Sequence, residues 1–216
     1  MKDINFKQSE DTLFLEEEHI ILRDQIKKFV EAEVKPVATK WEKKGFIPRE
    51  VFKKMGALGF LGITYPTEYG GSEMDVRGSV VFAEELGKST YSGFAIASLV
   101  HTDMASVHLL NAGNREQKEN FLPDIISGNK ISCVAVTEPH AGSDVKNIRT
   151  KAQKVGNKYL INGSKIFITN GVHADIYFVA AKTSDRFQQS SNITMFIVRK
   201  DNPGLIVNKQ LDKHGW

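Results

Sequence analysis

The sequence predicts an α+β fold, in which an N-terminal all-helical domain is followed by an antiparallel β domain. Up to about Ile131, apolar residues recur at the spacing of amphipathic helices. Beyond Ile131, short apolar runs alternate with polar turns, which is typical of strands, and no long helical pattern lies between them. A doubly wound parallel sheet is therefore not expected. We assign residues 1–130 to the helical domain and residues 131–216 to the β domain.

The first two predicted helices are bounded by proline. One helix should end at Pro36, because proline cannot continue a helix. Its apolar face consists of Leu22, Ile26, Phe29 and Val30. The next helix should begin near Pro48, because proline is favoured in a first turn. Its apolar residues are Val51, Phe52 and Met55.

Three further helices complete the helical half. The first of them contains the apolar residues around 80–86, and a long, mostly buried helix should span 94–110. The last should begin at Asn114, since Asn114 and Gln117 have the spacing of a capping box. It should end near Gly128.

Six strands are predicted in the second half. They cover residues 132–137, 149–155, 158–169, 175–181, 193–199 and 205–209. Gly156 and Asn157 separate two of them by the length of a tight hairpin turn.

The most informative segment is the apolar run that stops at Pro139 and opens into Ala141, Gly142 and Ser143. Small side chains let a ligand approach backbone N–H groups, and successive N–H groups pointing one way bind anions. The Ser143 hydroxyl adds a donor. The alternative is an ordinary corner between a strand and a turn, in which Ser143 or Asp144 caps the turn. Taken alone, the segment leaves both interpretations open.

A second segment, residues 163–171, also ends in a polar turn that contains glycine. If it is a strand, Phe167 and Thr169 point to the same face and present one ring and one hydroxyl together. Such a pair suits a flat heteroaromatic ligand. The alternative is a strand with an ordinary alternation of side chains.

Together these segments resemble the acyl-CoA dehydrogenases, flavoproteins that desaturate acyl-CoA thioesters between the α and β carbons. The motifs that carry the resemblance are AVTEPHAGSD at 135–144, IRTKA at 148–152, KIFITNG at 165–171, PTEYGG at 66–71 and NAGNREQK at 111–118. They occur in the order of the family and run from about Glu16 to Trp216. Several motifs in order are more specific than any one of them.

The resemblance implies FAD as the cofactor and assigns residues to it. It places Val136 and Thr137 at the pyrimidine edge of the flavin, Thr169 near the flavin N5 and Phe167 against a ring face. Gly142 and Ser143 would meet the pyrophosphate, and Ser143 would also contact the substrate. The full set implied for the cofactor is Val134, Val136, Thr137, Gly142, Ser143, Phe167, Ile168 and Thr169.

Two positions depart from the common family pattern. Phe167 stands where many members carry tryptophan, which is similar to the long-chain branch. Asn147 occupies a place that is usually small, and we expect it to shift the turn without abolishing it.

The reaction of the family requires a carboxylate base for the α proton, polarisation of the thioester carbonyl and a flavin that accepts the β hydrogen. In the family the glutamate base comes from a helical region beyond the sheet domain, and this sequence ends at Trp216. We therefore assign no catalytic residue here and expect an inactive, truncated form that lacks the C-terminal helical domain. The resemblance implies acyl-CoA as substrate, an electron-transfer flavoprotein as acceptor and a homo-oligomer, a tetramer when full length.

Two alternatives stay open at this point. One is a non-catalytic binding or interaction fragment, and the other is a related flavin-dependent acyl-CoA oxidase or monooxygenase.

Composition predicts a soluble globular protein with a packed core, with 41% hydrophobic and 25% charged residues. The resemblance implies that it is an oxidoreductase. A net charge of +3 is too small to indicate a nucleic-acid partner. The absence of an unbroken apolar run of membrane-spanning length, and of a signal-peptide pattern at Met1, predicts a cytoplasmic protein without a membrane partner. Cys133 alone cannot form an internal disulfide and is expected to be a buried, inert thiol. No histidine pairing indicates a metal site.

Overall fold

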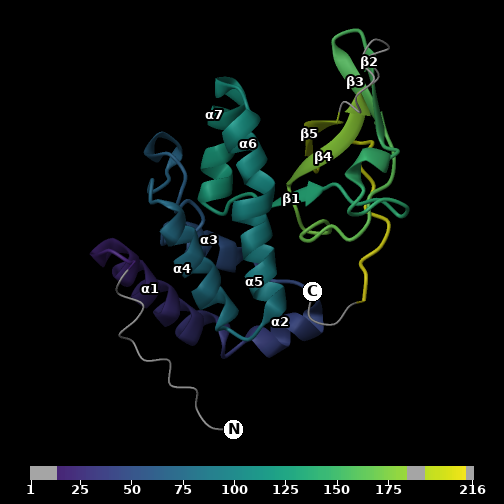
Figure 1. The fold of residues 1–216 in the computed structure, drawn as a ribbon. Coiled ribbons are helices and arrows are strands. Elements are labelled where there is room, and N and C mark those ends of the chain that lie inside the picture. The colour runs from purple at the N-terminus through teal and green to yellow at the C-terminus, as the bar shows by residue number, and fades with distance from the viewer. Residues whose placement is uncertain (1–13, 184–192, 213–216) are drawn as a thin grey trace.

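The computed structural model of the protein describes residues 14–183 and 193–212. A helical half precedes a β half, as predicted, and Figure 1 shows the helices packed together beside the strands. The α-helices are α1 (Glu17–Phe29), α2 (Ala38–Lys44), α3 (Arg49–Ala57), α4 (Val76–Gly87), α5 (Ser92–Leu99), α6 (Ser106–Ala112) and α7 (Arg115–Ile126). Two π-helical segments, η2 (Val30–Val34) and η4 (Val100–Ala105), continue α1 and join α5 to α6.

The helical core confirms the predicted apolar faces. All four residues of the first face are buried, and the helical path ends with η2, just before Pro36. Pro48 precedes the first residue of α3, whose Val51, Phe52 and Met55 are buried in the same core. These side chains pack against residues of α4 and α5, among them Val81, Phe82, Leu86 and Phe94.

The predicted capping box of α7 is present in full. The Asn114 side chain accepts a hydrogen bond from the Gln117 N–H at 2.8 Å. The Gln117 side chain accepts one from the Asn114 N–H at 3.0 Å. Two donors of the first turn, which would otherwise have no partner inside the helix, are satisfied, and the start of the helix is fixed.

The segments α5, η4 and α6 form one continuous helical path over Ser92–Ala112. By length and a mean hydropathy of 1.2, this path matches a membrane span, but 50% of the apolar window is buried inside the protein. The buried residues face α7, β1 and the loop after α3, which is the arrangement of a core helix.

The sheet is built around one long strand. Its strands are β1 (Ser132–Ala135), β2 (Lys151–Val155), β3 (Lys158–Asn162), β4 (Ile176–Thr183) and β5 (Ile193–Arg199). β4 pairs with β1, β2 and β5, while β3 pairs with β2. β2 and β3 form the predicted hairpin, in which Val155 opposes Lys158 across Gly156 and Asn157.

The expectation of an antiparallel sheet is wrong for two of the pairings. β1 and β2 both run parallel to β4, and only the β2–β3 and β4–β5 pairs are antiparallel. Parallel neighbours need a long crossover, which is usually a helix. Between β1 and β4 the crossover consists of loops and the β2–β3 hairpin, so the lack of a helical pattern did not reveal it.

Three predicted strands differ from the observed ones. The first ends at Ala135 rather than at residue 137, and the third ends at Asn162 rather than at residue 169. Residues 205–209 form no strand. The early end of the third predicted strand has the largest effect on the site, because Phe167 has φ +60° and cannot continue an extended strand.

The β2–β3 hairpin projects from the rest of the sheet (Figure 1). β3 is the last strand in the order β1–β4–β2–β3, so its outer edge has no strand partner among the described residues. Val155, Tyr159 and Leu160 on this hairpin are about half exposed.

A charged contact joins the two halves. Arg49 at the start of α3 donates both terminal nitrogens to the Asp175 carboxylate, at 2.6 and 2.9 Å. Asp175 also accepts the Ile131 N–H at 2.9 Å. The beginning of β4 and the entry into β1 are therefore fixed to the helical half at one point.

Candidate functional site

The segment that follows β1 makes a tight turn. The Glu138 N–H donates to the Ala141 carbonyl at 2.9 Å, and the Ala141 N–H donates back to the Glu138 carbonyl at 3.2 Å. Pro139 and His140 form the exposed tip. The backbone N–H and C=O groups of Glu138 and Ala141 bond each other in this turn. The residues that follow, Gly142 and Ser143, belong to no helix or strand.

Gly142 and Ser143 are the open part of this loop. Both are exposed, and a Cβ added to Gly142 would meet no heavy atom within 4 Å. In the described part of the chain, neither N–H group donates to a protein acceptor, and the Ser143 hydroxyl makes no hydrogen bond. Among the described residues, two adjacent backbone donors and a hydroxyl therefore have no protein partner and could bind an anionic group.

The second predicted segment lies directly beside the first. The Ile166 N–H donates to the Thr137 carbonyl at 3.0 Å, and Lys165 Nζ donates to the Val136 carbonyl at 2.9 Å. Residues far apart in sequence are thus held together by hydrogen bonds. The structure brings the two candidate segments together as a pair of loops rather than as two strands.

Glu138 organises the centre of this pair of loops. Its buried carboxylate accepts from Lys165 Nζ at 2.8 Å, from the Arg149 N–H at 2.6 Å and from the N–H and hydroxyl of Thr150. Burial alone would raise the pKa of Glu138, but these hydrogen bonds, with that from Lys165 the largest among them, lower it to about 2. A carboxylate held by four donors stabilises the loops and is unsuited to act as a base.

Phe167, Ile168 and Thr169 occupy the bend after Lys165. Phe167 is 60% exposed, whereas Ile168 and Thr169 are half-buried. A bulky residue at φ +60° is a backbone outlier that costs on the order of 1–3 kcal/mol, and such strain is concentrated at functional sites. The structure therefore exposes an aromatic ring by means of a strained backbone, although not by the strand alternation that we predicted.

The remaining predicted residues lie at the end of β1. Val134 is in the strand, and Val136 and Thr137 follow it; all three are half-buried. They are close to residues 165 and 166 through the hydrogen bonds given above, whereas Gly142 and Ser143 lie beyond the Glu138 turn.

The sequence did not reveal Lys165, Thr150 and Asn170 as residues that build the site. The Asn170 side chain donates to the Ala97 carbonyl at 2.9 Å and to the Ser132 carbonyl at 3.3 Å. Lys165 lies between Ser164 and Ile166, at a change from polar to apolar residues, which does not mark it as a buried charge. Thr150 and Asn170 gave no signal either, because their partners are distant in the chain.

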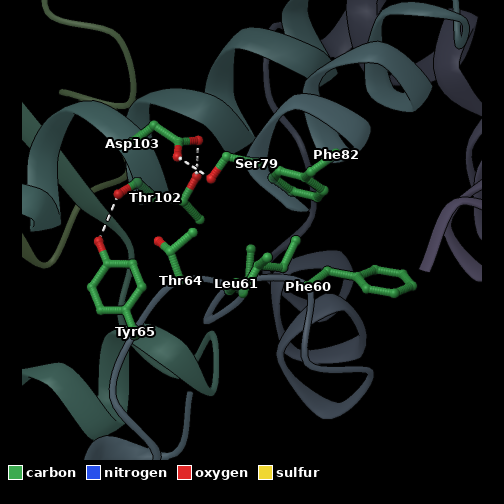
Figure 2. Close-up of a pocket in the computed structure, with 9 residues that line it drawn as sticks. Phe60, Leu61, Thr64, Tyr65, Ser79, Phe82, Thr102 and Asp103 are labelled. Atoms are coloured by element: carbon green, nitrogen blue, oxygen red, sulfur yellow. Dashed lines mark hydrogen bonds between the residues drawn. The ribbon is translucent and has the colours of Figure 1, made fainter. Parts of the chain in front are cut away.

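Two hollows lie elsewhere. One, of about 10 Å³, is lined by residues that include Tyr65, Ser79, Thr102 and Asp103, and it holds about one water molecule. Figure 2 shows the Thr102 and Ser79 hydroxyls directed at the Asp103 carboxylate. The other is an open groove of about 460 Å³ along the β2–β3 hairpin, beside Arg149, Lys151 and Leu160. Neither contains a predicted site residue.

Metal and thiol chemistry have no centre in the described residues. No group of three or more His, Cys, Asp or Glu side chains there could hold a metal ion. Cys133 is fully buried, and burial raises the pKa of its thiol, so the thiol is inert as expected.

Both halves of the chain match models of one family. Residues 16–129 match the acyl-CoA dehydrogenase N-terminal domain, and residues 133–216 match the acyl-CoA dehydrogenase middle domain. An acyl-CoA dehydrogenase of Bacillus subtilis is 40% identical, with 92% of this chain and 52% of the relative covered. The mitochondrial isovaleryl-CoA dehydrogenase of Pongo abelii is also 40% identical, with 93% and 48% covered.

Solved structures of acyl-CoA dehydrogenases are also similar to this chain. The acyl-CoA dehydrogenase of Geobacillus kaustophilus has a TM-score of 0.87 at 40% identity, over 93% of this chain and 53% of that one. A Bacillus anthracis acyl-CoA dehydrogenase complexed with FAD has a TM-score of 0.85 at 32% identity, over 93% and 34%. The chain thus spans about half the length of the curated relatives that it matches.

Proposed function

The chain belongs to the acyl-CoA dehydrogenase family, and from this premise we propose that it forms the FAD-contacting part of an enzyme that desaturates acyl-CoA thioesters. One observation carries the proposal. Free backbone donors at Gly142 and Ser143 and the exposed, strained Phe167 ring lie on two loops that Lys165 and Glu138 hold together. A dinucleotide with a flat ring system and a pyrophosphate needs an aromatic surface and backbone donors together.

The residues present fit such a cofactor. The half-buried Val136 and Thr137 would bind the polar edge of the flavin, and the Thr169 hydroxyl would donate beside them. Phe167 would cover one ring face, while Val134 and Ile168 would contribute backbone and apolar contacts. Gly142 and Ser143 would bind the pyrophosphate. When bound, FAD supplies the acceptor for the β hydrogen of the substrate.

Ser143 would also contact the acyl-CoA substrate, because its hydroxyl is exposed and makes no hydrogen bond to the residues that the structure describes. The base is proposed to come from outside these residues. Glu138 is the buried carboxylate between the loops. Its pKa of about 2 and its four hydrogen-bond donors make it unsuited to act as the base. The half-length match to the relatives supports a separate source.

The wider setting is proposed on the family resemblance. It comprises a role in fatty-acid or branched-chain catabolism, an electron-transfer flavoprotein as the electron acceptor, a homo-oligomeric assembly and a cytoplasmic location. The length and branching of the acyl chain are left open, since an isovaleryl-CoA dehydrogenase is as similar as any relative given above.

The test replaces Thr137 and Thr169 together by valine, which removes two hydroxyls and nearly keeps the shape. FAD retention is expected to fall about thirtyfold, or the visible flavin bands to shift, because the two lost hydrogen bonds contribute about 1 kcal/mol each. Flavin content and absorption spectra of the purified protein measure this. Thr67→Val, on an exposed turn of the helical half, is the control.

Unchanged flavin content and spectra in the double variant would remove both threonines from the site. A wild-type protein that takes up no FAD at all would contradict the proposed function itself.

A further inference from the structure

The edge of β1 that faces the helical half is closed by side chains. β1 pairs on its other edge with β4, and among the described residues it has no second strand neighbour. Instead, the Ser132 N–H donates to His101 Nδ1 at 3.0 Å. The Ser132 carbonyl accepts from the Asn170 side chain at 3.3 Å. Both backbone groups of the first strand residue are thus used by distant residues.

His101 lies in the π-helical segment η4 and is fully buried. Its Nε2 is 3.0 Å from the Ile125 carbonyl of α7, which can only accept, and its Nδ1 receives a backbone N–H, which can only donate. These two partners require a neutral ring that carries its proton on Nε2. Burial lowers the pKa of His101 to about 4, so the ring is neutral at neutral pH.

Further contacts from α3 and from β1 hold the ring in place. The Phe52 ring packs edge-on against it at 5.5 Å between centroids. The Ser132 hydroxyl lies 3.0 Å from Nδ1 and 3.1 Å from the His101 carbonyl oxygen. A rigid imidazole therefore joins α7, η4 and the first residue of β1.

Backbone groups in a strand alternate sides with a period of two. The backbone N–H and C=O groups of Val134 therefore point to the same edge of β1 as those of Ser132. Val136 follows two residues later. Because β1 has only four residues, we expect a displacement of Ser132 to move the backbone of Val134 as well.

We propose that His101 is a positioning residue for the flavin: through Ser132 it sets the place of the β1 edge and thereby of Val134, Val136 and Thr137. This inference rests on the proposed function. Asn170 completes the arrangement, since its side chain ties Ser132 to the loop that carries Phe167 and Thr169 and also to the Ala97 carbonyl. Both loops of the site are thus attached by hydrogen bonds to the same part of the helical half.

Two matched variants separate the effects of the two hydrogen bonds that the His101 ring makes with Ser132 and Ile125. In His101→Asn the amide oxygen takes the approximate place of Nδ1 and keeps the Ser132 N–H. In His101→Gln the amide nitrogen takes the approximate place of Nε2 and keeps the Ile125 carbonyl. Each variant loses one bond, so a general loss of core packing affects both, whereas the β1 edge moves only in His101→Gln.

The first readout is hydrogen exchange of the backbone amides. We expect exchange at residues 132–135 to rise about fivefold in His101→Gln and less than about threefold in His101→Asn, since one hydrogen bond contributes about 1 kcal/mol. The second readout is the visible spectrum of the flavin in the FAD-loaded protein, which should shift in His101→Gln alone. Equal behaviour of the two variants, or a rise in exchange spread evenly over the helical half, overturns the proposal.

The exchange experiment needs no FAD, so it decides the positioning of β1 even if the wild-type protein takes up no flavin and the proposed function fails. If His101→Gln does not fold, Ser132→Ala replaces it. That variant keeps the Ser132 N–H bond but removes the hydroxyl contacts that hold the His101 ring beside Ser132, so it weakens the positioning and leaves the ring buried. We expect about threefold faster exchange at residues 132–135, and unchanged exchange overturns the proposal.

Discussion

At the scale of single residues, the loops of the site depend on a buried pair of oppositely charged groups. Lys165 and Glu138 form a pair whose side chains are 11% and 1% exposed, at 2.8 Å. Burial lowers the pKa of Lys165, and the contact with Glu138 opposes that effect. Removing one member of such a pair leaves the other buried and uncompensated.

Lys165→Met is therefore expected to lower the free energy of unfolding by about 3 kcal/mol. Urea unfolding followed by circular dichroism measures it. Lys28→Met is the control, because Lys28 is 75% exposed and its pair with Asp24 should contribute nothing measurable. A loss no larger than that of the control would show that the buried pair does not hold the loops.

His101 predicts a dependence of stability on pH. Its pKa falls from 6.5 to about 4 on folding, through burial, with the Ile125 carbonyl and the charge of Asp175 partly offsetting the shift. The unfolded chain then binds more protons between these two values. The stability that the neutral ring contributes is present above about pH 6.5 and is lost as pH falls toward 4.

Urea midpoints at several pH values between 7 and 4 test this. The wild-type midpoint should fall over that range, and His101→Gln, whose side chain does not titrate, should show a smaller slope. The same slope in both proteins would assign the pH dependence to other groups.

At the scale of elements, the sequence correctly predicted features that depend on neighbouring residues. It did not predict the pairing of strands that are distant in the chain. The capping box of α7 and the β2–β3 turn depend on residues within three or four positions of each other, so the sequence displays them. The parallel pairing of β1 with β4 joins residues more than forty positions apart. Nothing in a single strand distinguishes a parallel from an antiparallel partner.

The loop around Phe167 shows the same division. The residue types around Phe167 and Thr169 predicted a ligand surface, but their alternation wrongly predicted a strand. The loop conformation arises from hydrogen bonds of Lys165 and Ile166 to residues 136–138, which lie almost thirty positions earlier. The identity of the candidate residues was thus accessible from sequence, and their geometry was not.

The strain at Phe167 predicts opposite effects on stability and on binding. Phe167→Gly should raise the free energy of unfolding by about 1 kcal/mol, because glycine adopts φ +60° freely and the ring is 60% exposed. The same change should weaken FAD binding, because the aromatic surface is lost. Thermal unfolding and equilibrium dialysis with FAD measure the two effects.

Tyr159→Gly is the matched control for stability, since Tyr159 is 47% exposed in β3 without a positive φ. It should destabilise the protein, as glycine does within a strand. If Phe167→Gly destabilises it as much, the strain at this position is not relieved by glycine.

At the scale of the whole molecule, the described residues contain the loops proposed for the cofactor, and the buried carboxylate between those loops, Glu138, is unsuited to act as a base. Purified alone, the 216-residue chain should fail to bleach added FAD when given straight-chain acyl-CoA. Without a positioned carboxylate, removal of the α proton loses a factor of about 10²–10⁴ in rate. Anaerobic titration with several chain lengths, followed by flavin absorbance, measures it, and substrate-dependent bleaching at an enzymatic rate would show a base within these residues.

The outer edge of β3 has a consequence for the behaviour of the isolated chain in solution. Its unpaired N–H and C=O groups, with Tyr159 and Leu160 about half exposed beside them, form a template on which a strand of another molecule can add. Lys158, on β3 itself, places positive charge where two such edges would meet, and that repulsion opposes aggregation. Because salt screens charges over about 10 Å at 0.1 M, turbidity should develop faster as ionic strength is raised.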